Sequence, residues 1–333
     1  MTIIKRLLGT LAIAGLVALS GCGGGEDESG KIRIAMVPKG TAHTFWKTIH
    51  AGGEKASQEL GNVELLWKGP LGEGDREGQI KVVENFVTQG VDAIALAPLD
   101  DVALVRPVKE ASKDGIKVVI WDSGLDDSGK DFYQSFVATD NFVAGQKCGR
   151  KMAEVLEGKG KIVMLRYAVG SASTTKREEG FLSGLKEAGP DIEVISSDKY
   201  AGQTVAKAQE ASNNLLNQFG DQIDGIFTSN ESASEGMLKA LRSADLAGKV
   251  KFVGFDFNDA LVEGIEAGHI HATAAQDPFT MGQLAVKTAV ALVKGETVEE
   301  VIDTGSVILT KDNLQDEKIQ KILKPDIAKW LGE

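Results

Sequence analysis

The chain has 333 residues, of which 42% are hydrophobic, and its 48 acidic against 37 basic side chains give a net charge of −11. Such a surplus of negative charge repels a phosphate backbone and argues against nucleic acid as a partner. With two cysteines and four histidines, the sequence offers neither a disulfide framework nor a cluster of metal ligands, and we expect no cofactor.

The first 21 residues have the pattern of a bacterial lipoprotein leader. Lys5 and Arg6 precede an apolar run that ends in Leu19-Ser20-Gly21-Cys22. The run is shorter than the about 20 residues of a membrane-spanning helix, and small residues before a cysteine favour cleavage and acylation. We expect Cys22 to become the lipid-modified N-terminus, in an inner or outer membrane. The alternative is an ordinary signal peptide with an incidental cysteine.

Residues 22–30 offer no large apolar side chain to bury, which predicts a flexible tether before a fold that begins near Lys31. Loss of the leader removes two cations and no anion, so the net charge changes from −11 to −13. About 300 residues exceed what one hydrophobic core usually organises, and we expect two domains.

Short apolar runs alternate with amphipathic runs along the rest of the chain. The first series predicts strands at 32–37, 63–67, 93–97 and 118–121, with helices at 45–60, 76–89 and 102–113. The second predicts helices at 142–156, 177–188, 205–219 and 234–241, with strands at 162–165, 192–196, 225–228 and 250–255. Strand 269–275, helix 281–294 and strand 306–309 follow. This alternation predicts an α/β fold of two similar Rossmann-like lobes with parallel sheets.

Polar residues follow the expected strands, at the sheet edge where ligands of open parallel sheets bind. They are Lys39, Asp122, Asn230, Asp256 and Gln276. Taken singly, each aspartate could equally cap the segment after it, and Asn230 has the position of an ordinary helix N-cap. Their shared placement on strand ends favours hydrogen bonds to neighbouring hydroxyls of a ligand, whose ring face Phe45 or Trp46 would cover.

Other features indicate structure rather than chemistry. His269 and His271 share a strand face but lack a third ligand for a metal, and residues 69–78 are typical of an exposed loop. Cys148 has no partner and is expected to be a packed helix residue. No Gly-x-Ser-x-Gly elbow or phosphate-binding loop occurs, so an enzyme is disfavoured. Arg177 is expected to open a helix, where the helix dipole disfavours a cation, so its place there calls for a binding role.

An ordered set of motifs resembles the periplasmic sugar-binding proteins of ribose and allose type. The motifs are Ile34-Ala35-Met36-Val37, Phe45-Trp46, Asp122, Arg177-Glu178-Glu179-Gly180-Phe181, Asn230, Val253-Gly254-Phe255-Asp256 and Ala275-Gln276. The resemblance spans residues 31–309 and implies two lobes with hinge crossings near residues 139–140, 276–277 and 304–305. One lobe would comprise residues 31–139 and 277–304, and the other residues 140–276 and 305–333.

The resemblance also implies which residues contact a sugar. They are Lys39, His43, Phe45, Trp46 and Asp122 from the first lobe, Arg177, Asn230 and Asp256 from the second, and Gln276 at a hinge. Phe255 would pack beneath the ring, and either Tyr200 or Gln203 would add a further contact. His43 and Ser123 stand where ribose binders of this type have asparagine and arginine, and the loss of that bidentate cation argues against ribose. Lys39 and Trp46 match the allose-type pattern.

Three functions are compatible with this resemblance. The first is capture of a monosaccharide, as a pyranose or a furanose, in the periplasm or at the cell surface by a monomer, for delivery to an ABC-type permease. The second is presentation of a sugar, or of a furanose signal such as autoinducer-2, to a receptor. The third, a transcriptional repressor with the same two lobes, conflicts with the leader and with the lack of an N-terminal DNA-binding helix pair.

Overall fold

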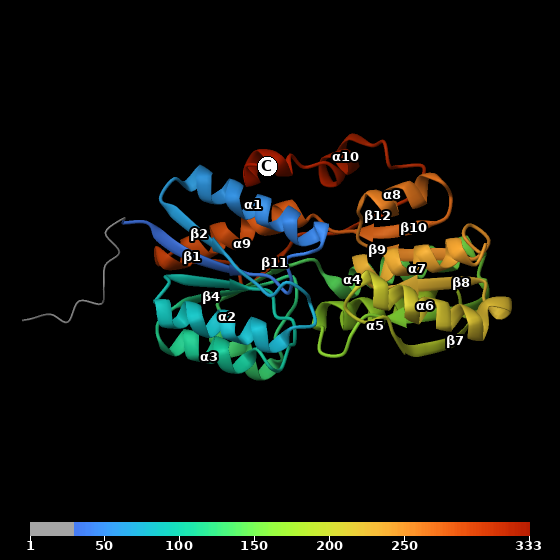
Figure 1. Ribbon diagram of the computed structural model, residues 1–333, viewed down its shortest axis with the longest axis horizontal. Coiled ribbons are helices and arrows are strands. Elements are labelled where there is room, and N and C mark those ends of the chain that lie inside the picture. The colour runs from blue at the N-terminus through green and yellow to red at the C-terminus, as the bar shows by residue number, and fades with distance from the viewer. Residues whose placement is uncertain (1–29) are drawn as a thin grey trace, which may run out of the picture. The chain divides into compact units, whose positions relative to one another are not determined.

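Two six-stranded sheets form the framework of the protein (Figure 1). The inner strands of each sheet are short apolar runs that are almost fully buried, whereas the edge strands are partly exposed. The computed structural model describes residues 30–333, so the predicted leader and the predicted lipid site at Cys22 lie outside the described residues. The predicted two-lobe α/β fold with mainly parallel sheets is confirmed. No helix in the described part of the chain has the length and apolarity that a membrane span needs.

The first sheet has the order β11-β5-β4-β3-β1-β2, with every pair of neighbours parallel. Helices α1 (Thr44–Leu60) and α9 (Pro278–Val293) share a core on one face, and α2 (Arg76–Gln89) and α3 (Val105–Lys113) share a core on the other. The strands are β1 (Ile32–Val37), β2 (Val63–Trp67), β3 (Ala93–Leu96), β4 (Lys117–Trp121), β5 (Ser135–Ala138) and β11 (Val301–Asp303).

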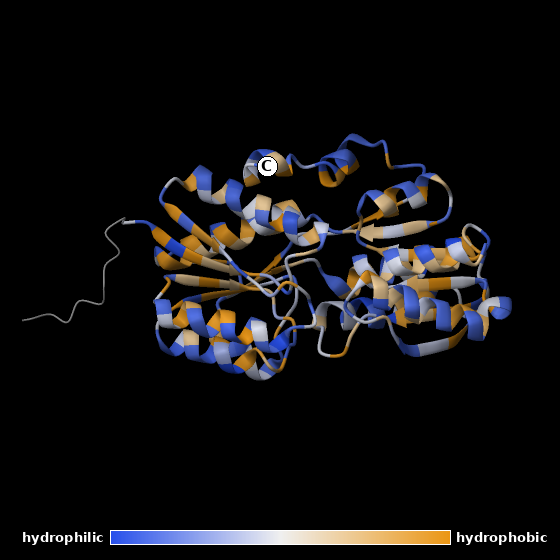
Figure 2. Cartoon of the chain, in the orientation of Figure 1, coloured by the Kyte–Doolittle hydropathy of each residue, from blue (hydrophilic) through white to orange (hydrophobic). Residues whose placement is uncertain are grey.

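The second sheet repeats this order as β12-β10-β9-β8-β6-β7, with β12 antiparallel to its neighbour. One face packs against α4 (Asn141–Val155) and α5 (Ala172–Ala188), and the other against α6 (Val205–Phe219), α7 (Glu231–Ser243) and α8 (Asp259–Glu266). The strands are β6 (Lys159–Arg166), β7 (Asp191–Tyr200), β8 (Gly225–Thr228), β9 (Lys251–Phe255), β10 (Ala272–Ala275) and β12 (Val307–Leu309). In Figure 2 hydrophobic residues concentrate on the strands and on the helix sides that face them.

The chain passes between the two sheets after β5, after β10 and after β11. A further passage follows β12. Leu314 and α10 (Glu317–Leu323) pack in the second lobe, but α11 (Ile327–Leu331) lies against α1 of the first lobe. There the ammonium of Lys55 stands 5.5 Å from the centre of the Trp330 ring. The assignment of residues 305–333 wholly to the second lobe is therefore corrected for α11.

Some predicted element boundaries are wrong. Helix α5 begins at Ala172, not at Arg177, so the argument that placed a cation at a helix start does not hold. Strand β10 begins at Ala272, not at residue 269, because the amides of His269 and Ile270 both donate to the carbonyl oxygen of Gly264 at the end of α8. The short strands β5 and β11 were not predicted.

Glycines bring two helix pairs into backbone contact. A Cβ added at Gly145 of α4 or Gly180 of α5 would lie 2.1 Å from a carbonyl oxygen of the partner helix. Gly52 of α1 and Gly282 of α9 approach each other's helices in the same way, at 2.0 and 2.1 Å. Any larger residue must push these helices apart, so the glycines fix the positions of the side chains that α1 and α5 carry.

We predict that Gly180→Ala lowers the free energy of unfolding by about 1–3 kcal/mol, because the added methyl group has no space between α5 and α4. The measurement is denaturant unfolding at equilibrium. Gly220→Ala is the matched control, since Gly220 has helical dihedral angles and a Cβ there would meet only Leu246, at 3.8 Å. Equal stability of the two variants would show that the helix pair tolerates separation.

Candidate functional site

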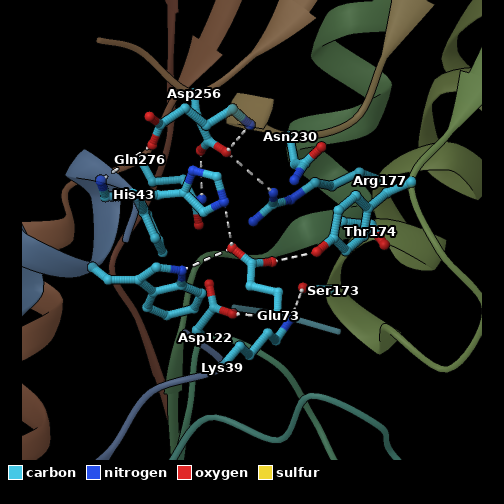
Figure 3. A pocket seen from close by; sticks show the side chains of 14 residues that line it. Lys39, His43, Glu73, Asp122, Ser173, Thr174, Arg177, Asn230, Asp256 and Gln276 are labelled. Carbon is cyan, nitrogen blue, oxygen red and sulfur yellow. Dashed lines mark hydrogen bonds and ion pairs between the residues drawn. The ribbon is translucent and has the colours of Figure 1, made fainter. Parts of the chain in front are cut away.

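A cleft between the two lobes lies at the carboxyl ends of the strands (Figure 3). Protein atoms leave about 350 Å³ of empty space in it, including the part open to solvent. All nine primary residues predicted from sequence line this space: Lys39, His43, Phe45, Trp46, Asp122, Arg177, Asn230, Asp256 and Gln276. Five further lining residues were not predicted: Glu73, Tyr167, Ser173, Thr174 and Glu231.

The same backbone turn presents a carboxylate in each lobe. Asp122 follows β4 and Asp256 follows β9, with left-handed φ values of 60° and 66°. Each backbone amide is held by the adjacent strand segment, through Val137 O at 3.0 Å and Ala274 O at 2.7 Å. Left-handed backbone is unfavourable for most residues, but aspartate tolerates it. The two turns direct both carboxylates into one cleft.

The carboxylate of Asp122 is paired with a cation that also reaches the second lobe. Lys39 Nζ lies 3.3 Å from Asp122 Oδ2, and both side chains are almost fully buried. The same ammonium donates to Ser173 Oγ at 3.0 Å, at the start of α5. A buried ammonium needs such partners, because removal of a charge from water is costly unless it is paired.

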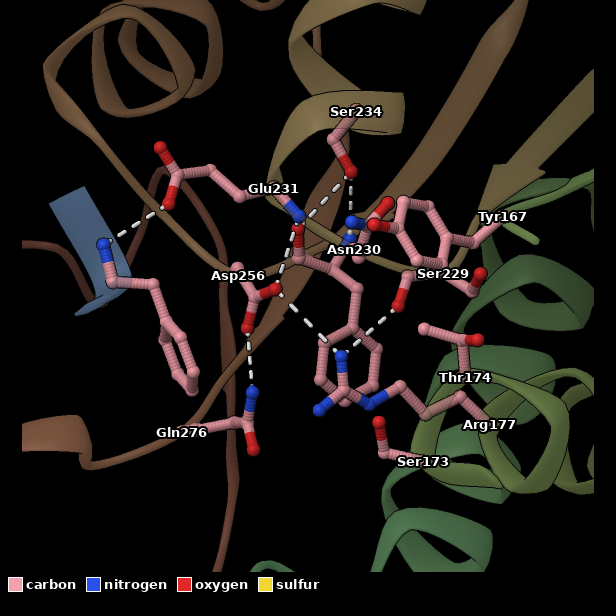
Figure 4. Close-up of polar contacts among 12 residues, drawn as sticks. Tyr167, Ser173, Thr174, Arg177, Ser229, Asn230, Glu231, Ser234, Asp256 and Gln276 are labelled. Carbon is pink, nitrogen blue, oxygen red and sulfur yellow. Dashed lines mark hydrogen bonds and ion pairs between the residues drawn. The ribbon is translucent and has the colours of Figure 1, made fainter. Parts of the chain in front are cut away.

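Asp256 is held by two hydrogen bonds and one ion pair from its own lobe and the adjoining hinge (Figure 4). Gln276 Nε2 donates to it at 2.7 Å and the amide of Glu231 at 3.0 Å, while Arg177 Nη1 lies 3.7 Å away. Burial raises the pKa of this carboxyl, and the Arg177 charge opposes that rise. Asp256 does not cap α8, because Asn258 Oδ1 accepts from the amide of Leu261 there.

Arg177 is immobilised by contacts on several sides. Its Nε donates to Asn141 Oδ1 at 2.7 Å and its Nη1 to the carbonyl of Ser229 at 3.1 Å. The guanidinium lies 4.0 Å above the ring of Phe255, which is fully buried. Phe255 therefore packs beneath this cation and is not among the residues that line the cleft.

The first turn of α7 contributes two polar side chains. Asn230 Oδ1 caps the helix by accepting from the amide of Ala233 at 3.2 Å, and the residue lines the cleft as well. Glu231 crosses to the first lobe, where its carboxylate accepts from the amide of Phe45 at 3.1 Å. Burial raises the pKa of Glu231 to about 7, the nearby charge of Asp256 adds to the rise, and His43 and the Asn258 amide oppose it.

Most residues of the loop 69–78 are exposed or partly exposed, in line with the prediction, but Glu73 within it is only 7% exposed. Its Oε1 accepts from Trp46 Nε1 at 2.8 Å and lies 3.4 Å from His43 Nε2. Its Oε2 accepts from the hydroxyl of Tyr167 in the second lobe. The sequence signal for this role was weak, since one acid between two glycines is usual in solvent-exposed turns.

Both predicted aromatic residues border the cleft, and Trp46 is also part of the core. Its ring makes edge contacts with Phe45 and Trp121, at centroid distances of 5.0 and 5.7 Å.

Gln276 presents an acceptor atom that is unpaired within the described part of the chain. Its Oε1 is buried and has no hydrogen-bond partner among residues 30–333. A buried acceptor without a partner is costly, and this one belongs to a side chain that lines the cleft.

Comparisons with known proteins show to which family the chain belongs. A family model described as periplasmic binding protein domain matches residues 34–297. The D-ribose/D-allose-binding protein of Pseudomonas aeruginosa is 30% identical, over 82% of this chain and 86% of its own length. The D-allose-binding periplasmic protein of Escherichia coli is 30% identical over 79% and 85%. The chain belongs to the periplasmic binding protein family.

The solved structures agree with this assignment. An ABC transporter solute binding protein from Agrobacterium vitis with bound D-fucose has a TM-score of 0.84 and 34% identity, covering 88% of this chain and 100% of that one. A carbohydrate transporter solute binding protein from Agrobacterium radiobacter in complex with D-arabinose has a TM-score of 0.84 and 32% identity, over 88% and 99%. The resemblance to sugar-binding members of this family is thus confirmed.

The two alternative contacts predicted for this periplasmic binding protein are both outside the cleft lining. Tyr200 ends β7 and is 47% exposed. Gln203 is partly buried and faces the loop of Glu73, with Oε1 3.8 Å from where a Cβ on Gly74 would stand. Neither residue is brought to the other predicted ligand contacts, and a role for either stays a prediction.

We predict that Glu231 makes stability depend on pH. Between its ordinary value of 4.5 and about 7, the folded protein holds a proton that the unfolded chain has released. The free energy of unfolding contributed by this group is therefore fully present below pH 4.5 and falls as pH rises to 7, by on the order of 3 kcal/mol. Glu231→Gln should flatten this part of the profile in denaturant unfolding.

The control for this measurement is Glu263→Gln, which changes an exposed carboxylate on the neighbouring helix α8 and should keep the parental profile. A parental slope in Glu231→Gln would contradict the assignment of the effect to Glu231.

Proposed function

We propose that the protein captures one monosaccharide between its lobes and releases it to an ABC-type permease. The observation that carries this proposal is the pair of buried carboxylates, Asp122 and Asp256, on matched turns that face one cleft. The cleft opens at the strand ends where ligands of parallel α/β folds bind. The relatives of the protein are named for the binding of sugars and not for catalysis, which supports a binding role.

The chemistry of the cleft suits a polyhydroxylated ring. Carboxylates accept hydrogen bonds from neighbouring hydroxyls, while Lys39 and Arg177 donate to them. Gln276 Oε1 offers a buried acceptor that a further hydroxyl would satisfy. Phe45 and Trp46 border the same space and give it an apolar side, as the C–H face of a sugar requires.

We favour a pyranose as the ligand. Ser123 stands where ribose binders of this type have arginine, and its hydroxyl accepts from the amide of Ser173 across the cleft at 3.1 Å. This position thus serves contact between the lobes instead of a bidentate contact to sugar.

The proposed transport role also accounts for the N-terminal segment predicted from the sequence. A lipid on Cys22 and the tether after it would hold the protein at a membrane, in the periplasm or on the cell surface. Relatives that are described as import or transporter components support delivery to a permease over presentation to a receptor. We propose that the protein acts as a monomer and meets the membrane through this lipid alone.

We predict that Asp256→Asn weakens sugar affinity by roughly ten- to a thousand-fold, because the loss of charge removes a strong acceptor of hydroxyl hydrogen bonds. Asparagine preserves the size of the side chain and tolerates the left-handed backbone. A thermal-shift screen of monosaccharides identifies the ligand, since saturation at about 100 Kd adds ~2.7 kcal/mol of stability. Calorimetric titration then compares the variant with the parent.

Thr204→Ala is the control for Asp256→Asn, because it removes the side-chain cap of α6 in the same lobe, at an exposed residue outside the cleft lining. It should cost about 0.5–2 kcal/mol of stability and bind sugar with near-parental affinity. Parental affinity in Asp256→Asn would contradict the binding role of Asp256. A screen in which every pentose and hexose leaves the melting temperature unchanged would refute the proposed function itself.

A further inference from the structure

The loop between β2 and α2 places a buried acid at the boundary of the two lobes. Glu73 is flanked by Gly72 and Gly74 and belongs to the first lobe. Figure 3 shows its carboxylate at the centre of the lining side chains, between groups of both lobes. Both oxygens are already bonded to protein donors, Oε1 to Trp46 and Oε2 to Tyr167. Each oxygen of Glu73 thus already accepts a hydrogen bond from a protein group, one from each lobe.

The partner in the second lobe is held in place by a separate network. Tyr167 follows β6 and is 3% exposed. Its amide donates to Glu178 Oε1 at 3.0 Å, and Glu178 Oε2 is paired with Arg166 at 2.7 Å. Burial, with the charge of Glu73, raises the pKa of Tyr167 well above its ordinary value. The phenol accordingly stays protonated and can donate to the carboxylate over the whole neutral range.

We infer that Glu73 and Tyr167 form a latch across the cleft, which favours closure of the lobes and couples it to the orientation of Trp46 and His43. The inference rests on the proposed function, since both groups border the proposed sugar site. Separated lobes would leave the carboxylate and the phenol in water, whereas closed lobes join them in a charge-assisted hydrogen bond. Glu73 also holds Trp46 from its own lobe, so it acts as a positioning residue.

The chemistry of the pair gives it a distinct effect on binding. The latch stabilises only the closed form. Its loss should therefore mainly speed the release of sugar and leave the free energy of unfolding of the empty protein unchanged. Tyr167→Phe removes one hydroxyl and keeps the ring. We expect a Kd about ten- to a hundredfold weaker, with most of the change in the dissociation rate.

The test compares Tyr167→Phe, Glu73→Gln and the double variant with the parent. Calorimetry gives Kd for the sugar found in the thermal-shift screen, and stopped-flow tryptophan fluorescence gives the dissociation rate. The two single losses should not add in the double variant, since each breaks the same bond. Tyr133→Phe is the matched control, because Tyr133 is a half-buried tyrosine outside the cleft and should leave Kd unchanged.

A second measurement separates the latch from sugar binding. Spin labels on exposed positions of the two lobes, Glu77→Cys and Lys199→Cys, report the distribution of interlobe distances with and without sugar. We expect Tyr167→Phe to lower the closed fraction in both states. Parental Kd, dissociation rate and distances in Tyr167→Phe would overturn the latch, as would a loss of empty-state melting temperature that accounts for the weaker binding. If no sugar binds the parent, the proposed function fails and the sugar-free distances still decide on the latch.

Discussion

Charged groups that leave water must find partners, and in this protein the partners come from both lobes. Lys39 pairs with Asp122 of its own lobe and donates to Ser173 of the other. Glu231 of the second lobe accepts from the amide of Phe45 in the first. The two contacts between the lobes, Lys39 to Ser173 and Phe45 to Glu231, form only when the lobes meet, and separation of the lobes would return these groups to water. The cleft is thus a shared structure, and its geometry follows from how the lobes meet.

The two lobes use the same local structures to position their binding groups. A left-handed turn after β4 or β9 presents an aspartate, and a helix pair joined through glycines supports the neighbouring binding groups. In the second lobe, the close contact of α4 and α5 also brings Asn141 to the guanidinium of Arg177. Rigid supports of this kind restrict the motion of the ligand-binding atoms. Because the two sheets have the same strand order, these turns and helix pairs stand at corresponding positions in the two lobes.

The sequence was most informative where apolar runs end abruptly in polar residues. Asp122 and Asp256 were predictable because a buried parallel strand must present its next residue at the ligand edge. Glu73 was not, since its burial depends on Trp46 and Tyr167, which lie 27 and 94 residues away along the chain. The start of α5 was misplaced because Ala172 to Lys176 carry small or polar residues without a clear helical period. The position of α11 against α1 likewise depends on tertiary packing that local pattern does not encode.

The course of the chain between the sheets has a consequence for the order of folding. Residues 141–275 supply strands β6–β10 and helices α4–α8 without interruption, so most of the second lobe exists as one continuous segment. The first lobe lacks α9, which covers one of its faces, and its edge strand β11 until residue 303 has been made. Contacts between distant segments form late, because closing a long loop costs entropy before the contact repays it. The lobe that begins the fold in sequence is therefore the one that completes it last in time.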